Sequence, residues 1–470
     1  MGFSIAKRSG SAARKLTILT AVFAVGGCAG YDPQPLPRQS NLQGSLARLD
    51  AVIPADASHG ASRKIDTSRP LSVDEVGLLA VLNDPDLKSE QGESDAARAD
   101  VVQATLLPNP TAGFAYGQLL GGPGTASSAA VSLAEDIIPI ITRDARVKAA
   151  DARSRQVDAS QLWREWQIAQ KARQLALDIS YDDRSIALTE KELSHIAAAR
   201  TKAGKAVAAG NLALGAYAPL LSAASAQEQA LAALRLQRLK NWQALDALLG
   251  LDPSVRFAIA PPTAPAPPAA IEPLVASAHE RRPDLAALRF GYDSAEADVR
   301  VAILSQFPAF SLNGSYLSDT TSIVSAGPGA TFALPIFDRN QAGVSKTQAT
   351  RQMLQAQYQA RLDAAAAAAR GLSAQMLRLF ADLAKARSAV RSSESLAVSA
   401  RNAYAQGNLD QRNLVDYEST AFQQELQALA LERQMAEDAI LLELELGLGL
   451  PPERLAVRPP PPPDHGNRLL

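Results

Sequence analysis

Short motifs recur once along the chain in the same order, and this repetition constrains the fold more than any other feature of the sequence. Five landmarks of the first half return in the second half at offsets of 196 to 200 residues. The pairs are Asp84-Pro85-Asp86-Leu87 with Arg282-Pro283-Asp284-Leu285, Leu107-Pro108 with Phe307-Pro308, Pro139-Ile140 with Pro335-Ile336, Gly210-Asn211-Leu212 with Gly407-Asn408-Leu409, and Gly250-Leu251 with Gly449-Leu450. Chance matches would not preserve both order and spacing, so we infer an internal duplication.

Each copy is predicted to begin with a helix and to continue with a pair of strands. Residues 71–105 and 271–304 have helical patterns, which end before Pro108 and Pro308 because proline cannot continue a helix. An alternation of period two follows in both copies. It places one set of side chains on one face of the strands, namely Phe114, Tyr116, Leu312 and Tyr316, and another on the opposite face, namely Ser311, Asn313 and Ser315. Glycine-containing loops at residues 121–124 and 327–329 are expected to join the strands of each pair.

Two proline-free stretches, residues 143–208 and 339–406, predict very long helices. At 1.5 Å per residue each would extend over roughly 95 to 100 Å, which no ordinary globular core requires. Apolar residues in these stretches follow the alternating spacing of a coiled-coil seam, at Ile168, Ala172, Leu175 and Ile179 and at Leu372, Met376, Leu379, Leu383, Ala386 and Val390. Gly210 and Gly407 interrupt the helical pattern, and new helices follow at once, so each copy is expected to end in a helical hairpin.

The first residues have the organisation of an export signal. Residues 1–27 contain basic residues, then an apolar run from Leu16 to Gly26, then small residues before Cys28. This run is shorter than the roughly 20 residues that a membrane-spanning helix needs, so we expect a cleaved segment. Val25-Gly26-Gly27-Cys28 resembles a bacterial lipobox, which predicts lipidation of Cys28; a lone thiol in an ordinary signal peptide is the alternative. Ala29, in place of aspartate, favours sorting to the outer membrane.

Six segments follow from these patterns. We predict a signal peptide at 1–27, a lipidated extended leader at 28–70, a first structural repeat at 71–253, a proline-rich linker at 254–270, a second repeat at 271–452, and a proline-rich tail at 453–470. The fold class is therefore mainly α with a small β part.

Composition argues against several functions. The formal net charge is −1, so no basic field exists that would hold nucleic acid. The four histidines stand far apart, the four methionines form no cluster, and Cys28 is the single cysteine, so we predict no metal site and no cofactor. The glycine-rich loops lie between strands, and the sequence offers no catalytic constellation. We therefore predict that the protein is not an enzyme.

With these residues in view, the chain resembles the TolC-type outer-membrane factors, over residues from about 71 to 452. The resemblance rests on the duplicated order of helix, strand pair and long helical hairpin. Leu106-Leu107-Pro108-Asn109-Pro110 and Phe337-Asp338-Arg339-Asn340-Gln341 are most similar to the branch that serves resistance-nodulation-division pumps. The resemblance implies a homotrimer with a shared twelve-stranded transmembrane β-barrel and an α-helical tunnel across the periplasm. It also implies a periplasmic adaptor (membrane fusion) protein and an inner-membrane pump as partners.

The resemblance extends to particular residues. We expect the hairpin tips, Gly210-Asn211-Leu212 and Gly407-Asn408-Leu409, to dock on the adaptor; the alternative is that each glycine only permits the backbone to turn. It also implies a periplasmic gate at Tyr404 and Asp416, and we place Asp410 in the same acidic mouth. The first copy has Leu214 and Ala216 there, without an acid. Alternatively, Asp410 caps the helix start and Asp416 is simply solvated.

Three functions remain at this point. The first is an outer-membrane exit duct of a tripartite efflux or secretion system, anchored by lipid at Cys28. The second is a structural lipoprotein whose coiled coils only span the periplasm; strand pairs argue against it, because a spacer does not need them. The third, an enzyme with a site in the tunnel, lacks the necessary residues.

Overall fold

The computed structural model describes residues 33–53, 63–124, 126–263 and 265–448. The chain divides into two compact units, Met1–Asn41 and Leu42–Leu470, and every element named below belongs to the second unit. The predicted signal segment, Cys28 and the proline-rich tail lie outside the described residues.

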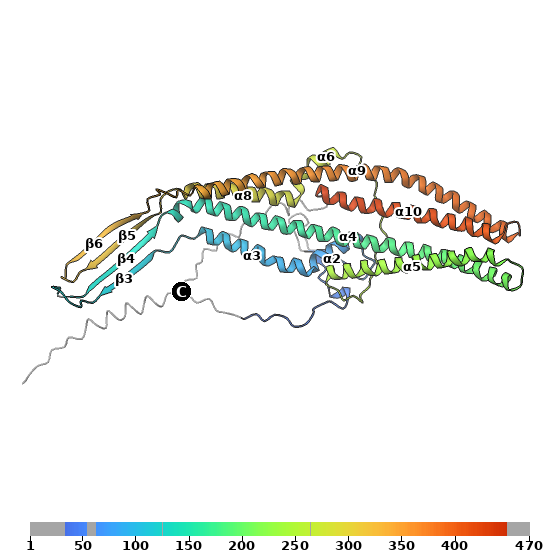
Figure 1. Ribbon diagram of the computed structural model, residues 1–470, viewed down its shortest axis with the longest axis horizontal. Helices are drawn as coiled ribbons and strands as arrows, with labels where there is room; N and C mark the ends of the chain where they lie inside the picture. Colours follow the sequence, from blue (N-terminus) through green and yellow to red (C-terminus); the bar gives the residue numbers. More distant parts are fainter. Residues whose placement is uncertain (1–32, 54–62, 125, 264, 449–470) are drawn as a thin grey trace, which may run out of the picture. The chain divides into compact units, whose positions relative to one another are not determined.

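Apart from three short elements at the start of the first half, the two halves of this unit follow the same order of helices, strand pair and helical hairpin (Figure 1). The first half comprises a short helix η2 (Leu46–Arg48), strands β1 (Val52–Ile53) and β2 (Arg63–Lys64), helices α2 (Val73–Asn83) and α3 (Pro85–Thr105), strands β3 (Thr111–Gly117) and β4 (Ser128–Asp136), and helices α4 (Ile138–Ala208) and α5 (Leu214–Leu249). The second half comprises α6 (Glu272–Ala276), α7 (Ala278–Arg281), α8 (Pro283–Leu304), β5 (Phe310–Ser318), β6 (Val324–Phe332), α9 (Gln341–Ala405) and α10 (Gln411–Leu446). The predicted order of helix, strand pair and helical hairpin is thus present twice.

The first helix of each half is broken where the sequence predicted one continuous helix. Asp84 ends α2 and caps α3, because its side-chain carboxylate accepts hydrogen bonds from the backbone N–H groups of Asp86, at 2.9 Å, and Leu87, at 3.0 Å. Pro85 then occupies the first turn of α3, where its missing N–H costs nothing. In the second half the break falls before Pro283, which begins α8 after two short helices. The repeated Pro-Asp-Leu motif therefore marks a helix start.

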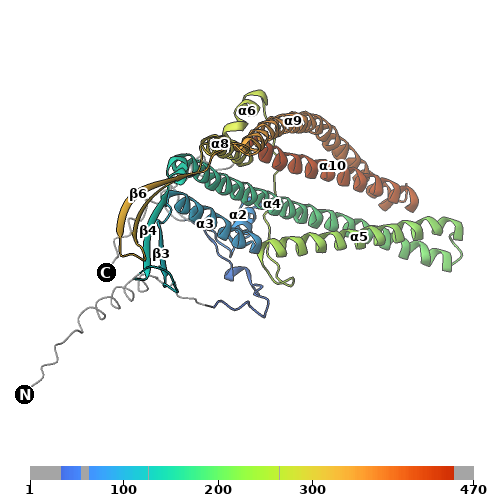
Figure 2. The ribbon, with the colours of Figure 1, turned by 60° about the vertical axis from the view of Figure 1, so that its left-hand side comes forward.

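The long helices meet the prediction closely. Helix α4 has 71 residues and α9 has 65, and neither contains an internal proline beyond its first turn. Seven of the ten predicted seam residues are buried, namely Ala172, Leu175, Ile179, Met376, Leu379, Leu383 and Ala386. Helix α4 packs against α3, α5, α8 and α10, and α9 packs against α8 and α10. Figure 2 shows α4 between α3 and α8. The seams thus join each hairpin internally and also join the two hairpins.

Strands β3 to β6 form one antiparallel sheet in sequence order. It lies at one end of the long helices, and the hairpin turns lie at the other (Figure 1). Residues 121–124 join β3 to β4, as predicted. The prediction of a loop at residues 327–329 was wrong: these residues lie inside β6, where Pro328 pairs with Gly314. Because β6 is an edge strand, it can accommodate a proline.

The turn between β5 and β6 is built around Asp319. Its carboxylate accepts hydrogen bonds from the backbone N–H groups of Thr321, at 2.8 Å, and Ile323, at 2.9 Å. Ser322 takes the left-handed conformation, with φ of 66°. The Asp319 side chain supplies the hydrogen bonds of this turn, so the turn does not need a glycine. The prediction had placed the turn at glycines, and for that reason missed it.

The largest apolar cluster joins residues between Leu46 and Leu71 to α2, α4 and α5. It includes Leu46, Leu71, Leu79, Ile179 and Leu245. Parallel bridges from Gln43 to Leu251 and from Leu71 to Ile259 attach these residues to the segment that follows α5. None of the helices in the described part of the chain is both long and apolar enough to cross a membrane.

Candidate functional site

The strand register separates the side chains of the sheet onto two chemically different faces. Partners across each antiparallel pair share a face. Phe114 lies opposite Val131, which lies opposite Tyr316, so their side chains form one row. One face contains the apolar residues Ala112, Phe114, Tyr116, Val131, Leu133, Leu312, Tyr316, Val324 and Ala326, with Glu135 at the end of β4. The other face contains Gly113, Ser132, Ser311, Asn313, Ser315, Ser325, Gly327 and Gly329, with Leu317 near the end of β5. The structure therefore places the predicted apolar and polar sets on opposite faces.

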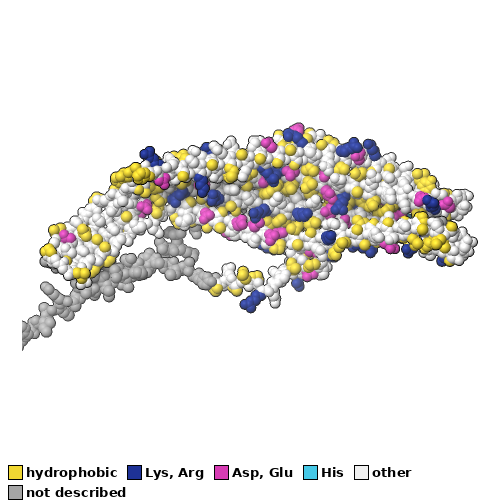
Figure 3. Space-filling model, viewed as in Figure 1, with side chains coloured by type: hydrophobic (Ala, Val, Ile, Leu, Met, Phe, Trp, Pro, Cys, Tyr) yellow, Lys and Arg dark blue, Asp and Glu magenta, His cyan; other side chains and the backbone are white. Residues whose placement is uncertain are grey.

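The apolar face is exposed in a single chain. Phe114 is 73% exposed and Tyr116 is 61% exposed. Acidic residues occur only at the end of β4 among the four strands, as Glu135 and Asp136, and the strands contain no basic residue. Figure 3 shows the same contrast, with charged side chains numerous over the helices and sparse over the sheet. An exposed apolar face of this kind requires a nonpolar environment or a partner surface.

Both edges of the sheet are open. Strand β3 pairs only with β4, and β6 pairs only with β5, among the residues that the structure describes. Each edge therefore presents unpaired backbone N–H and C=O groups, which bond to water, to another strand, or remain unsatisfied at a cost.

The two hairpin tips have nearly the same backbone geometry. Gly210 and Gly407 take left-handed conformations, with φ of 73° and 77°. The next residue donates back to the preceding helix at 2.8 Å in both tips, from Asn211 N–H to the Ala206 carbonyl and from Asn408 N–H to the Ala403 carbonyl. This is the hydrogen-bond pattern of a helix C-terminus that ends on glycine. The glycines are thus required by the turn.

The side chains of the tips differ in exposure. Asn211 and Asn408 are exposed, whereas Leu212 and Leu409 are half-buried. Leu212 packs against a cluster of Ala199, Ala203, Leu220 and Val415. Since Val415 belongs to α10, the side chain of Leu212 helps to hold the two tips together.

The predicted gate residues lie close together in sequence but have different surroundings. The Asp410 carboxylate caps α10 by accepting from the Asn413 backbone N–H at 2.8 Å. Tyr404 is half-buried in the last turn of α9, and the Lys202 ammonium lies 5.4 Å from the centre of its ring. Asp416 is exposed, in the second turn of α10. In the single chain these residues lie on the second tip, and a ring between chains stays a prediction.

A polar cluster links α4 to α9 and α10 near the tips. Glu192 is 3% exposed, and its carboxylate accepts from the Ser419 hydroxyl at 2.7 Å. Glu418 lies 3.3 Å from Arg401 and 3.9 Å from His195. Burial raises the pKa of Glu192, although the hydrogen bond from Ser419 opposes the rise. These contacts connect the two hairpins.

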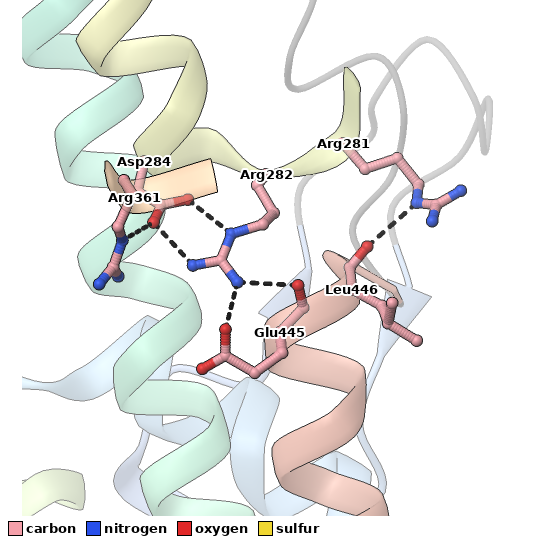
Figure 4. A network of polar contacts seen from close by, with 6 residues as sticks. All are labelled: Arg281, Arg282, Asp284, Arg361, Glu445 and Leu446. Atoms are coloured by element: carbon pink, nitrogen blue, oxygen red, sulfur yellow. Dashed lines mark hydrogen bonds and ion pairs between the residues drawn. The ribbon is translucent and has the colours of Figure 1, made fainter. Parts of the chain in front are cut away.

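Adjacent arginines fix the far end of α10. Arg282 is 1% exposed and donates to the carbonyl of Glu445 at 2.8 Å, and Arg281 donates to the carbonyl of Leu446 at 3.1 Å (Figure 4). Arg282 also binds the Asp284 carboxylate at 2.8 and 3.0 Å, and Arg361 approaches the same carboxylate at 2.5 Å. Cations at a helix C-terminus stabilise its free carbonyls.

The electrostatics of this network follow from its contacts. Burial alone would raise the pKa of Asp284, but hydrogen bonds and charges from Arg282 and Arg361 hold it below the usual range. The rings of Trp163 lie below both guanidinium groups, at 5.0 and 5.7 Å. The sequence showed Arg282 only as a repeat landmark, because its partners are up to 163 residues away.

No group of three or more His, Cys, Asp or Glu side chains in the described part of the chain is arranged to hold a metal ion. Sequence reasoning also missed a cluster formed by Asp178, Asp182, Arg433 and Glu437. The only sign of this cluster in the sequence was the presence of charged residues next to the apolar residues of α4 and α10.

Comparisons with known proteins agree with this architecture. Residues 274–448 match the family model described as outer membrane efflux protein. No curated protein matches. The chain is similar to the outer-membrane channel OprN (18% identity, TM-score 0.67, covering 90% of this chain and 99% of that chain). It is also similar to VceC of Vibrio cholerae (18%, 0.67, 80% and 96%) and to the CmeC channel of Campylobacter jejuni (14%, 0.67, 80% and 85%). The second repeat therefore matches the outer membrane efflux protein model, and the resemblance of the chain to the TolC-type outer-membrane factors is confirmed at the level of the fold.

Proposed function

We propose that the protein is the outer-membrane exit duct of a tripartite efflux or secretion system. The observation on which this rests most is the sheet, which has one apolar face, one polar face and two open edges. A sheet with these properties suits a barrel wall between lipid and a watery lumen. The long hairpins behind it suit a tunnel across the periplasm.

The open edges argue for three chains. Within lipid each unpaired backbone group costs several kcal/mol, so strands must close into a barrel. Four strands are too few, because known transmembrane barrels have about eight or more. Three copies joined from β3 to β6 would give twelve strands, as in the family that the chain resembles. We infer a homotrimer in which Phe114, Tyr116 and Tyr316 face lipid.

The remaining assignments complete this proposal. The tips, at Gly210-Asn211-Leu212 and Gly407-Asn408-Leu409, dock on a periplasmic adaptor that connects to an inner-membrane pump. Threefold symmetry brings the copies of Asp416 together at the periplasmic mouth, with Tyr404 and Asp410 nearby. Acyl chains on Cys28 anchor the leader in the outer membrane.

Planar-bilayer recording tests the proposal. The detergent-extracted protein should run as a trimer and should conduct ions. Replacing Phe114 with aspartate places a charge on the lipid-facing side and should reduce insertion, whereas Ser132→Asp places it on the lumen side and should spare insertion while altering ion selectivity. A monomer that never conducts would contradict the duct and would favour the periplasm-spanning scaffold.

A further inference from the structure

Three carboxylates share a single guanidinium at the centre of the contact between the two hairpins. The guanidinium of Arg433, on α10, lies 2.9 Å from Asp178, 3.0 Å from Asp182 and 2.7 Å from Glu437. A different nitrogen of Arg433 faces each carboxylate. Asp178 and Asp182 belong to α4, so the cluster joins the first repeat to the second.

The two aspartates of the cluster are shielded from water, whereas the side chains of Arg433 and Glu437 are 31% and 27% exposed. The side chain of Asp182 is 1% exposed and that of Asp178 is 16% exposed. Asn241, on α5, donates to the second oxygen of Asp182 at 2.8 Å. If all three carboxylates were ionised, two negative charges would remain uncompensated in a poorly hydrated site, which is strongly unfavourable.

Neighbouring charges do not supply the missing cations. On α4, Arg173 pairs with Asp74 and Glu443, and Arg184 pairs with Glu432. Three further pairs lie on the packed elements: Asp183 of α4 with Arg238 of α5, Glu432 with Arg387 of α9, and Glu75 of α2 with Arg69. Asp438, next to Glu437 on α10, adds another buried carboxylate and no cation. The excess of acid is therefore local to the cluster.

The other hairpin lacks this arrangement. At the spacing that relates Gly210 to Gly407, Asp178 and Asp182 correspond to Gln375 and Leu379. Leu379 packs in an ordinary apolar cluster with Leu383 and Met435. Because the repeat forms the same hairpin without the acids, the hairpin fold does not require them.

We propose that Asp178, Asp182, Arg433 and Glu437 form a proton-dependent clasp between the two hairpins, tight when one carboxyl holds a proton and looser when all three are ionised. Asp178 is the group that holds the proton. Burial, together with the hydrogen bond and charge of Glu437, raises the pKa of Asp178 to about 7, although Arg433 opposes the rise. Burial also raises the pKa of Asp182. A protonated Asp178 can donate to Glu437 and leaves one uncompensated charge instead of two.

The sign of the pH effect follows from the raised pKa. The folded chain holds a proton on Asp178 that the unfolded chain has lost above about pH 4. The stabilisation is therefore complete below about pH 4 and declines as the pH rises to about 7, beyond which this group causes no further change. Over that interval the equilibrium between the folded and the unfolded chain should shift toward the unfolded chain, on the order of a hundredfold to a thousandfold.

Two measurements on the full-length protein in detergent test the clasp. Infrared spectra at pH 6 should show the C=O stretch of protonated carboxyls, which should vanish at pH 8.5. Asp178→Asn should remove the part of this band that Asp178 contributes and leave the part from Asp246, whose pKa is raised to about 6. The thermal unfolding midpoint should fall by several degrees from pH 5 to pH 8 in the wild type. Asp178→Asn should make this profile less steep, because asparagine imitates the protonated form at every pH while the other buried carboxyls continue to titrate.

Asp183→Asn is the matched control, since Asp183 is exposed on the same helix and pairs with Arg238 outside the cluster. It should keep the wild-type profile. If Asp178→Asn does not fold, Glu437→Gln provides the same comparison. A wild-type spectrum without a protonated carboxyl at pH 6, or an unchanged pH profile in the folded cluster variant, would overturn the clasp. Neither readout needs channel activity, so the outcome is independent of the proposed duct.

Discussion

Arg173 Nε lies 2.8 Å from a carboxylate oxygen of Asp74, and the same pairing recurs in the second repeat. There the guanidinium of Arg370 binds Glu272 through two hydrogen bonds of 3.0 and 2.9 Å. In each repeat an arginine of the long helix thus holds the start of the short helix that precedes the sheet. The duplication has kept an ion pair as well as an order of elements.

Arg282 should be the most sensitive charged residue of the second repeat. Arg282→Met removes the only member of its network that reaches both Asp284 and the end of α10, and leaves buried carboxylates with fewer partners. Loss of one partner from a buried ion pair typically costs about 3 to 5 kcal/mol. Thermal unfolding should show this loss. Arg370→Met, at a pair whose side chains are 52% and 66% exposed, should leave the stability nearly unchanged.

An equal cost for the two substitutions would show that the Arg282 network contributes no more than a surface pair.

Long helices and strands could be predicted because their signals are local. Uninterrupted helical pattern indicated α4 and α9, and period-two alternation indicated β3 and β5. The position of the β5–β6 turn could not be predicted from glycine positions, because the side chain of Asp319 supplies the hydrogen bonds of the turn. The networks around Arg282 and Arg433 join residues far apart in sequence, and no local pattern specifies such pairs.

The glycines that end α5 and α10 offer a second, matched test. Gly250 and Gly447 both have φ of 63°, so alanine is strained at either position. A Cβ at Gly447 would also lie 3.1 Å from backbone atoms of Arg281 and Arg282, whereas at Gly250 the nearest atoms are at 3.7 Å. Gly250→Ala should cost about 1 kcal/mol, and Gly447→Ala should cost clearly more.

Chemical denaturation of both variants measures the difference. The packing account would be wrong if Gly447→Ala were no less stable than Gly250→Ala.

Asp438 should be a destabilising residue at neutral pH. It is 5% exposed on α10, and one of its carboxylate oxygens is buried without a hydrogen-bond partner. Burial and the charge of Glu437 raise its pKa, so its unfavourable contribution grows as the pH rises above the usual aspartate range. The equivalent residue of α5 is Asn241, which is neutral. Asp438→Asn should therefore stabilise the protein by about 1 to 2 kcal/mol at pH 8.

The same variant should show a smaller gain at pH 4, because the raised pKa of Asp438 makes the carboxyl protonated more often at pH 4 than at pH 8. Stability measured at the two pH values checks this, and an equal gain at both would exclude ionisation as the cause.

Adaptor docking is best probed through the exposed asparagines of the tips. Replacing Leu212 disturbs the apolar cluster that joins the tips, so a loss of efflux would not distinguish docking from folding. Asn211→Trp and Asn408→Trp add bulk to exposed side chains instead. Both should leave the thermal midpoint unchanged, yet weaken crosslinking to the adaptor and lower drug or metal tolerance by about tenfold or more, the loss expected at the centre of an interface.

Intact crosslinking and tolerance in both variants would mean that the adaptor binds elsewhere.

Substitutions of Asp410 and Asp416 should distinguish a residue that caps helix α10 from one that lines the periplasmic gate. Asp410 caps α10 in the single chain, so Asp410→Ala should cost about 1 kcal/mol of stability whatever the channel does. Asp416 is exposed, and its removal should leave stability unchanged. In a threefold mouth, however, three Asp416 carboxylates would lie near one another and attract multivalent cations. Asp416→Ala should therefore weaken the block of single-channel current by a trivalent cation applied from the periplasmic side. Identical block in wild type and variant would reject the ring at Asp416 and would leave the duct itself untouched.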